Sequence, residues 1–332
     1  MSIIFMGGFP PPYGGVTTKN RNLLLYLTEY IVIEKIDFNL IKRKNVKETV
    51  RLISSILNKK NQFIIGVAGR KTRKNLCRVL YIINRKAMKR SLIFLMGGAV
   101  VEDIRADTQY QKYIKHFKCI YAETKGMVRQ LEEIGITNVE YYPNCRARGE
   151  KKEYEVNKSF SCVFFSLISK EKGVDIILNV AEEIPSIKFY LYGEVSEEYT
   201  DEFYRHLKRC ENVTYKGVFR GNSEEVYNEL RKYSVLLLPT RWKAEGVPGI
   251  LIEAKIAGVP AIVSNQNFNA EIVKNGQNGI VIENCNEDEL KKAIITLNQD
   301  ISLRDKMSSQ AIQSAEEYYI DRYIPSIVQM LS

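Results

Sequence analysis

Residues 234–257 read SVLLLPTRWKAEGVPGILIEAKIA. The apolar run SVLLL predicts a buried strand, and the segment from Pro248 to Ala257 predicts a helix, with a polar loop between them. A strand, a loop and a helix start in this order form one step of a parallel sheet whose strands are connected by helices. The stretch therefore predicts an α/β fold.

The same alternation runs through the whole chain, which predicts two Rossmann-like domains. At 332 residues the chain is long enough for two cores. We expect an N-terminal acceptor-binding domain over 1–150, a C-terminal nucleotide-sugar-binding domain over 151–315, and a C-terminal helix over 316–332 that could pack back toward the first domain. Six strands are expected in each half: Ser2–Met6, Tyr30–Asp37, Gln62–Val67, Ser91–Met96, Cys119–Glu123 and Val139–Tyr142, then SCVFFSL, KFYLYG, VTYKG, SVLLLPT, PAIVS and GIVIE.

Composition argues against several other classes of protein. No segment approaches the roughly 18 apolar residues that span a bilayer, and the N-terminus does not resemble a signal peptide. The six cysteines form no C-x-x-C pair, and we find no companion histidine cluster, which argues against disulfides and zinc. A cytoplasmic protein fits these features best.

Positive charge is concentrated in the first half of the chain. Residues 1–150 hold 27 Lys and Arg against 12 Asp and Glu, and sixteen of these cations lie between Lys42 and Arg90 with one acid, Glu48. The segment from Lys74 to Arg90 predicts an amphipathic helix that could rest on an anionic membrane surface. The alternative is a helix with a solvated charged face. We expect no nucleic-acid partner, because no nucleic-acid-binding motif accompanies the charge.

Two glutamates flank the start of the predicted helix. Glu245 lies on the loop and Glu253 lies roughly one and a half turns into the helix, so both can face the carboxyl ends of the strands. The first backbone N–H groups of a helix favour an anion such as a diphosphate, and Gly246 and Gly249 let that backbone approach it closely. The alternative is that both glutamates are ordinary surface residues of a helix end.

The stretch EGVPGILIEAKIAGVPAIVS resembles the E-x(7)-E signature of the family-4 retaining glycosyltransferases of bacterial polysaccharide and lipid-linked glycan synthesis. The resemblance runs from about Val163 to Asn298 and includes Glu271. It implies the GT-B fold, two Rossmann-like domains facing a central cleft. It further implies that Glu245 contacts the transferred sugar, Glu253 the ribose, and the backbone of Gly246, Val247, Pro248, Gly249 and Ile250 the donor diphosphate.

Two further segments resemble donor-binding parts of the family. In SLISKEKGVDIIL, Lys172 and Gly173 match a basic diphosphate clamp, but Leu167 stands where the family has an arginine, and Lys170 is the candidate replacement. Gly14 and Gly15 match the family's N-terminal glycine loop. The resemblance thus assigns a catalytic role to Lys172 together with Glu245.

The N-terminal half departs from the family at its usual histidine. Gly97 and Gly98 occupy that place, and the chain's two histidines, His116 and His206, fall in predicted helices. We treat Gly97, Gly98, Glu102 and Asp103 as acceptor-side candidates. With no D-x-D pair, we expect no metal cofactor, the lysines and the helix dipole stabilising the leaving group instead.

The resemblance predicts a retaining hexosyltransferase that moves a sugar from a nucleotide sugar, with UDP as the expected nucleotide, to a glycan or polyprenyl-diphosphate-linked acceptor, as in capsule or O-antigen synthesis. Two alternatives stay open. One is a non-catalytic partner or chaperone of another transferase, motivated by the missing arginine and histidine. The other is a nucleotide-sugar 2-epimerase, which two histidines in predicted helices fit poorly.

Overall fold

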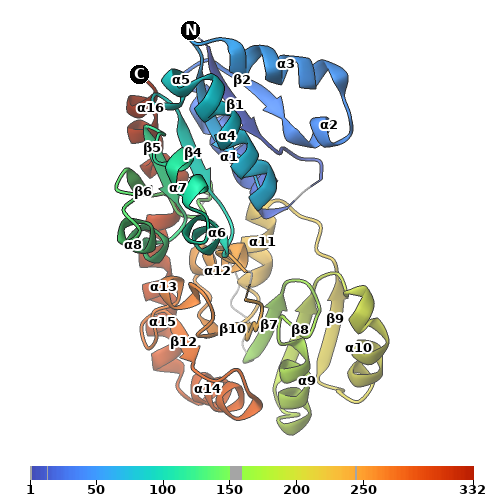
Figure 1. The fold of residues 1–332 in the computed structure, drawn as a ribbon. Coiled ribbons are helices and arrows are strands. Elements are labelled where there is room, and N and C mark those ends of the chain that lie inside the picture. Colours follow the sequence, from blue (N-terminus) through green and yellow to red (C-terminus); the bar gives the residue numbers. More distant parts are fainter. Residues whose placement is uncertain (1, 13, 150–158, 244) are drawn as a thin grey trace. The chain divides into compact units, whose positions relative to one another are not determined.

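The computed structural model describes residues 2–12, 14–149, 159–243 and 245–332. The chain forms two compact units, of which unit 1 comprises Met1–Arg148 with Tyr318–Ser332 and unit 2 comprises Gly149–Glu317. The twelve segments predicted as strands are the strands of two six-stranded parallel sheets, one in each unit (Figure 1).

Unit 1 is built on a sheet with the strand order β2-β1-β3-β4-β5-β6. Strands β3, β4 and β5 are buried along their whole length, as expected for parallel strands covered by helices on both faces. The elements are β1 Ile3–Gly7, α1 Gly15–Thr28, β2 Ile33–Asp37, α2 Phe38–Lys42, α3 Val46–Leu57, β3 Gln62–Gly66, α4 Arg70–Ile83, α5 Arg85–Met88, β4 Leu92–Leu95, α6 Val100–Arg105, α7 Thr108–Ile114, β5 Cys119–Ala122, α8 Lys125–Glu133 and β6 Val139–Tyr141.

The segment predicted as one helix from Lys74 to Arg90 is two helices, α4 and α5, so that prediction was wrong. The buried Asn84 separates them with a backbone φ of −140°, outside the helical range. Its side chain accepts a hydrogen bond from the Ala87 amide (3.2 Å) and donates one to the Ile56 carbonyl oxygen (2.8 Å). An asparagine that caps the next helix in this way ends the one before it.

The C-terminal tail returns to unit 1 as the helix α16, Ile324–Leu331. Ile324, Ile327 and Leu331 are buried in one hydrophobic cluster with Phe5 and Leu27. The helix predicted over 316–332 is shorter than expected, because 316–318 and 320–322 are 3₁₀ turns. Pro325 stands in the first turn of α16, a position where its missing N–H costs no hydrogen bond.

Unit 2 has the strand order β12-β11-β10-β7-β8-β9. The order reverses between β7 and β10, which are neighbours in the sheet although three strands apart in sequence. In open parallel sheets ligands bind at the carboxyl ends of the strands beside such a reversal. The elements are β7 Ser161–Phe165, α9 Val174–Glu183, β8 Lys188–Tyr192, η1 Glu197–Tyr199, α10 Thr200–Leu207, β9 Val213–Gly217, α11 Ser223–Leu230, β10 Val235–Leu238, α12 Gly249–Ala257, β11 Ala261–Ser264, α13 Asn269–Ile272, β12 Gly279–Ile282, α14 Glu287–Gln299 and α15 Ile301–Ala315.

Candidate functional site

Two predicted site residues meet at the reversal point of the unit 2 sheet. Lys172 lies on the loop after β7, and Glu245 lies on the loop after β10. The Lys172 ammonium forms an ion pair with the Glu245 carboxylate, and both side chains are largely buried. Lys172 Nζ also lies 4.7 Å from the centroid of the Trp242 ring, a cation–π contact. The fold therefore brings the two residues predicted as catalytic into direct contact.

The two loops can approach each other closely because residue 173 is a glycine. It caps the start of α9 with a φ of +76°, a conformation that glycine adopts without strain. A Cβ atom added there would lie 2.0 Å from the carbonyl oxygen of Pro239, on the loop after β10. Glycine is thus required here both for the backbone turn and for the space.

Glu245 is held by its backbone, and one of its side-chain oxygens has no partner among residues 2–12, 14–149, 159–243 and 245–332. Its carbonyl oxygen accepts a hydrogen bond from Asn267 Nδ2 (2.9 Å), which also donates to the carbonyl oxygen of Trp242 (3.0 Å). Asn267 adopts a φ of +51°. Glu245 Oε2 is buried and has no hydrogen-bond partner among the described residues. A buried carboxylate oxygen in this state is a strong acceptor for a ligand hydroxyl.

The remaining donor-side predictions fall around the start of α12. Gly246 and Val247 lie on the loop, Pro248 is the N-cap, and Gly249 is the first helical residue. Ile250 belongs to the first turn, where the leading amides of a helix lack intrahelical acceptors, although the Leu251 amide donates to the Pro248 carbonyl oxygen (3.2 Å). Glu253 is half-buried in the second turn.

The place of the family's clamp arginine is taken by an apolar side chain. Leu167 is 38% exposed and lines a cavity of about 590 Å³ with Ser169, Tyr199 and Trp242, all in unit 2. Lys170 also lines this cavity, but its ammonium pairs with Glu202 at 2.7 Å. The Lys170 ammonium is therefore already paired with the Glu202 carboxylate.

Arg241 is a structural residue that sequence reasoning missed. Its Nη2 atom donates to both carboxylate oxygens of Asp175, at 2.6 and 2.8 Å. Its backbone N–H donates to the carbonyl oxygen of Glu171. These bonds tie the loop after β10 to the loop after β7 and to the first turn of α9. The sequence signal was an arginine three residues after a buried strand, which alone is weak.

In unit 1 the glycines predicted as site residues lie at a helix start and after a strand. Gly14 is the N-cap of α1 and Gly15 is its first residue, where an added Cβ would meet nothing within 4 Å. Gly97 and Gly98 follow β4, and Gly97 has a φ of +106°. The space at Gly15 leaves the helix start open to a ligand.

Glu102 and Asp103, the acidic acceptor-side candidates, lie on helix α6. Asp103 lies within ion-pair distance of Arg70 (3.5 Å) and Arg73 (3.7 Å). Glu102 is exposed. Asp103 therefore takes part in a structural charge cluster.

Sequence reasoning also missed a buried ion pair in unit 1. Glu123, which follows β5, pairs with Lys19 of α1 and accepts a hydrogen bond from the Gly97 amide (3.2 Å). Burial, together with the positive charge of Arg146, lowers the pKa of Lys19 to about 7. The signal that could have found this pair is an acid placed directly after an apolar strand.

Comparison with known proteins gives the family. The model for glycosyl transferases group 1 matches residues 148–314. A 41.2 kDa protein from the cps region of Klebsiella pneumoniae is 30% identical over 131 residues, 39% of this chain and 35% of that protein. An Escherichia coli UDP-Gal:alpha-D-GlcNAc-diphosphoundecaprenol alpha-1,3-galactosyltransferase is 30% identical over 117 residues, 35% of this chain and 29% of that protein. The matched stretches thus span about a third of these curated relatives.

The fold comparison covers the chain from end to end. The HepE protein of Anabaena, solved in complex with UDP and glucose, has a TM-score of 0.76 at 13% identity over 100% of this chain and 99% of its own. Two Rossmann-like units of this kind define the GT-B class of α/β proteins. Within that class, the chain belongs to the family of group 1 glycosyl transferases.

Proposed function

We propose that this protein is a retaining glycosyltransferase that moves a hexose from a UDP-sugar to a glycan or polyprenyl-diphosphate-linked acceptor in bacterial surface polysaccharide synthesis. One observation carries the proposal. At the strand-order reversal of unit 2, Glu245 has a buried oxygen without a hydrogen-bond partner in the part of the chain that the structure describes, and it lies beside Lys172, just before the start of α12. A cation, an acceptor oxygen and a helix start suit a sugar diphosphate.

Each group has a distinct part in the proposed reaction. The diphosphate sits at the first amides of α12 and draws the Lys172 ammonium toward its negative charge. Glu245 then accepts a hydrogen bond from a hydroxyl of the donor sugar, and Glu253 accepts one from the ribose. The bond between the sugar C1 and the phosphate oxygen breaks while the acceptor oxygen bonds to C1 on the same face. The acceptor proton passes to the departing phosphate oxygen, which releases UDP.

The names of the relatives support the choice of donor and acceptor class. The E. coli relative is named for UDP-galactose and a diphosphoundecaprenol acceptor, and the Klebsiella relative comes from a cps region. The Anabaena structure holds UDP and glucose. The reaction as written needs no metal ion, because Lys172 and the α12 dipole oppose the charge of the leaving group.

The test combines donor binding with product analysis. UDP-, GDP- and ADP-sugars are screened with EDTA present, by thermal shift and by nucleoside diphosphate release, on the native chain, Glu245→Ala and a control, Glu132→Ala, at an exposed position of α8. We expect one UDP-sugar to stabilise the native chain and the control, with release at least about 100-fold slower in Glu245→Ala. No response by the folded native chain to any donor would favour the non-catalytic partner, and an inverted anomer by NMR would exclude retention.

We further infer that the protein docks on the anionic inner face of the cell membrane through α3. Val46, Val50, Ile53 and Leu57 recur at helical spacing and are between 54% and 74% exposed, whereas Ile56, on another side of the helix, is buried. Among the described residues, no helix is long and apolar enough to cross a bilayer. An exposed apolar stripe on a surface helix suits insertion at the lipid interface.

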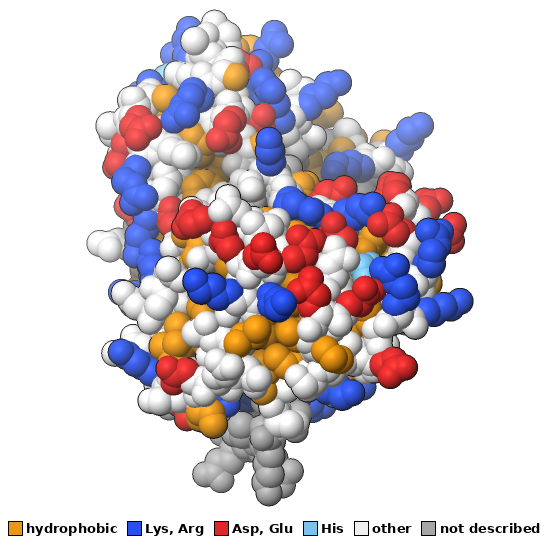
Figure 2. Space-filling view, turned by 90° about the horizontal axis from the view of Figure 1, so that it is seen from below, with side chains coloured by type: hydrophobic (Ala, Val, Ile, Leu, Met, Phe, Trp, Pro, Cys, Tyr) orange, Lys and Arg blue, Asp and Glu red, His pale blue; other side chains and the backbone are white. Residues whose placement is uncertain are grey.

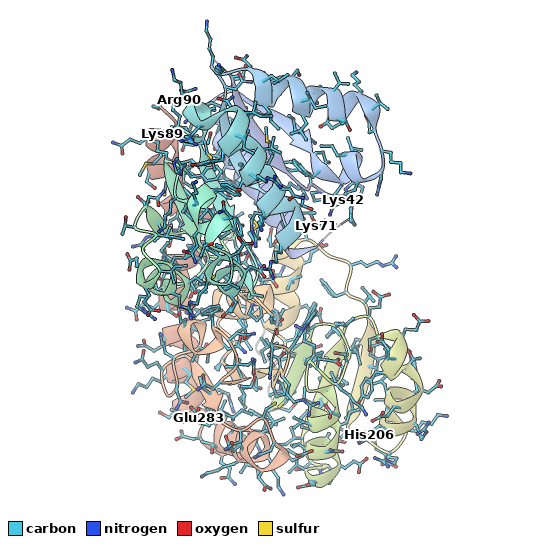
Figure 3. The ribbon with its side chains drawn as sticks, viewed as in Figure 1. Lys42, Lys71, Lys89, Arg90, His206 and Glu283 are labelled. Atoms are coloured by element: carbon cyan, nitrogen blue, oxygen red, sulfur yellow. The ribbon has the colours of Figure 1, made fainter. Side chains whose placement is uncertain are left out.

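Exposed cations lie at both ends of this stripe, and they favour anionic over neutral lipids. They are Lys42, Arg43, Lys44, Lys47, Lys59 and Lys60. Each contributes about 1 kcal/mol of attraction near an anionic leaflet. Of the other cations of 42–90, Arg51 lies on α3 and pairs with Glu48, Lys71 is in the first turn of α4, and Lys89 and Arg90 follow α5 (Figure 3). The proposed surface is therefore α3 and its flanks, not the whole basic segment.

A further inference from the structure

A group of three metal-ligating side chains lies in unit 2, apart from Lys172 and Glu245. Glu182 is in the last turn of α9, and His206 and Cys210 lie at and just beyond the end of α10, which Figure 3 shows with His206 labelled. One ligand atom from each residue lies within 4.8 Å of the other two. The sequence shows no cluster of histidines near its cysteines, but it does place one histidine, His206, four residues before Cys210.

The separation of this group from the donor site follows from the chain direction. Lys172 precedes α9, whereas Glu182 ends it, so the two lie at opposite ends of a ten-residue helix. A helix of this length spans about 15 Å. The group is therefore not part of the carboxyl-end site. On the face seen in Figure 2, acidic and basic side chains lie interspersed, with histidine surface among them.

The distances suit a tetrahedral ion. Glu182 Oε1 lies 3.0 Å from His206 Nε2 and 3.9 Å from Cys210 Sγ. Zinc bonded to nitrogen and oxygen at about 2.0 Å and to sulfur at about 2.3 Å places such atoms about 3.3 to 3.5 Å apart. His206 lies in the last turn of α10 and Cys210 in the turn that follows, with Cys210 Sγ 3.6 Å from the His206 carbonyl oxygen. Small side-chain movements would therefore complete the geometry.

Two features of the neighbouring side chains point to a ligand. His206 Nε2 is a buried atom that makes no well-aligned hydrogen bond to any residue described in the structure, although it lies 3.0 Å from the Glu182 carboxylate. The other cation at Glu182 is Arg209, whose Nε lies 2.9 Å from the same oxygen but whose side chain is 62% exposed. Arg209 can therefore turn into solvent when an ion takes its place.

We propose that Glu182, His206 and Cys210 bind Zn²⁺, with water as the fourth ligand. A thiolate, an imidazole and a carboxylate together favour zinc over magnesium or calcium, which prefer oxygen ligands alone. The ion would join the end of α9 to the end of α10. Glu202 of α10 lines the 590 Å³ cavity, so zinc would stabilise one wall of that cavity without entering the transfer chemistry.

The test measures metal on the full chain in the absence of any sugar donor. Chain stripped with EDTA is loaded with ZnCl₂ and desalted, and zinc is counted by mass spectrometry. We expect one zinc per chain and a rise in Tm of about 5 °C at 100-fold excess over Kd. Co²⁺ in place of zinc should give a thiolate charge-transfer band. Less than a tenth of an equivalent of zinc on folded native chain would overturn the proposal.

Substitutions separate this site from unspecific binding. Glu182→Gln, His206→Gln and Cys210→Ser should each weaken zinc binding by at least about 100-fold, and Cys210→Ser should remove the cobalt band. The control His116→Gln changes the chain's other histidine and should bind as the native chain does. Arg209→Ala, at an exposed position, should bind zinc several-fold more tightly because the competing cation is gone. Equal binding by all five variants would also overturn the proposal.

Discussion

The Lys172 ammonium contacts the Glu245 carboxylate across two loops that are 73 residues apart in sequence. The pair neutralises two largely buried charges at the point where the strand order of unit 2 reverses. A diphosphate binding nearby offers the lysine a stronger anion than the glutamate does. If the proposed function holds, donor binding therefore has to break the Lys172–Glu245 ion pair.

A double-mutant cycle on this pair tests the contact without any substrate. Lys172→Met and Glu245→Gln should each lower the free energy of unfolding, Lys172→Met by about 3 kcal/mol, because it leaves a largely buried carboxylate without its cation. Residues in direct contact should show a coupling energy of about 1–3 kcal/mol in urea unfolding. Additive effects within 0.5 kcal/mol would mean that the two side chains do not pair in solution.

Gly173 gives a second prediction, with a matched control in the same unit. Gly173→Ala should destabilise the chain by about 3 kcal/mol or more, because the new Cβ meets the Pro239 carbonyl oxygen and the backbone has a positive φ. Gly276 has nearly the same φ, +75°, but open space around its Cβ position. Gly276→Ala should cost about 1 kcal/mol, the backbone strain alone. Urea unfolding of both variants measures the difference in the free energy of unfolding. Equal losses would mean that contact with the Pro239 carbonyl oxygen adds no cost at position 173.

Asn267 is predicted to position Glu245 without touching the donor. Asn267→Gly accepts the positive φ but removes the donors to the carbonyl oxygens of Trp242 and Glu245. We expect kcat for sugar transfer to fall about 10- to 100-fold, because small misplacement of a reacting group is costly, while KM changes little. Lys44→Gly, at another described non-glycine residue of positive φ, is the control and should leave kcat unchanged when the acceptor is offered without a membrane, because Lys44 belongs to the proposed membrane surface. A fall in Tm that accounts for the lost activity would reduce Asn267 to a structural role.

The sequence predicted the fold well because buried parallel strands leave a clear local signal. All twelve strands overlap predicted segments, most of them apolar runs such as SVLLL, although β2 (IEKID) and β9 (VTYKG) are of mixed polarity. The helix at Gly249 begins one residue from its predicted start. Helix ends were predicted less well where a single side chain decides them. Asn84 ends α4 by capping α5, and its partner, the Ile56 carbonyl oxygen, is distant in sequence.

The site was predictable where it follows a motif and not where it depends on spatial neighbours. The sequence placed Lys172 and Glu245 on the same edge of the sheet, but not their contact. Arg241, Asn267 and the pair of Lys19 with Glu123 join separate segments of the chain, so a local pattern marks their positions at most weakly and does not give their partners. The same reason hid the group formed by His206 and Cys210, because its third member comes from another helix.

The membrane surface gives the last prediction, on a stripe that sequence reasoning assigned to another helix. Ile53→Asp on α3 should reduce binding to vesicles that contain anionic phosphatidylglycerol by at least about 10-fold, since a charge replaces an inserted apolar side chain. Ile312→Asp is the control, because Ile312 is equally exposed, at 54%, but lies on α15. Vesicles of neutral phosphatidylcholine should bind the native chain weakly, and added salt should weaken binding to the anionic ones, because the flanking lysines act through charge. Sedimentation with vesicles measures each case. Equal losses for the two variants, or binding that ignores lipid charge, would exclude α3 as the docking surface.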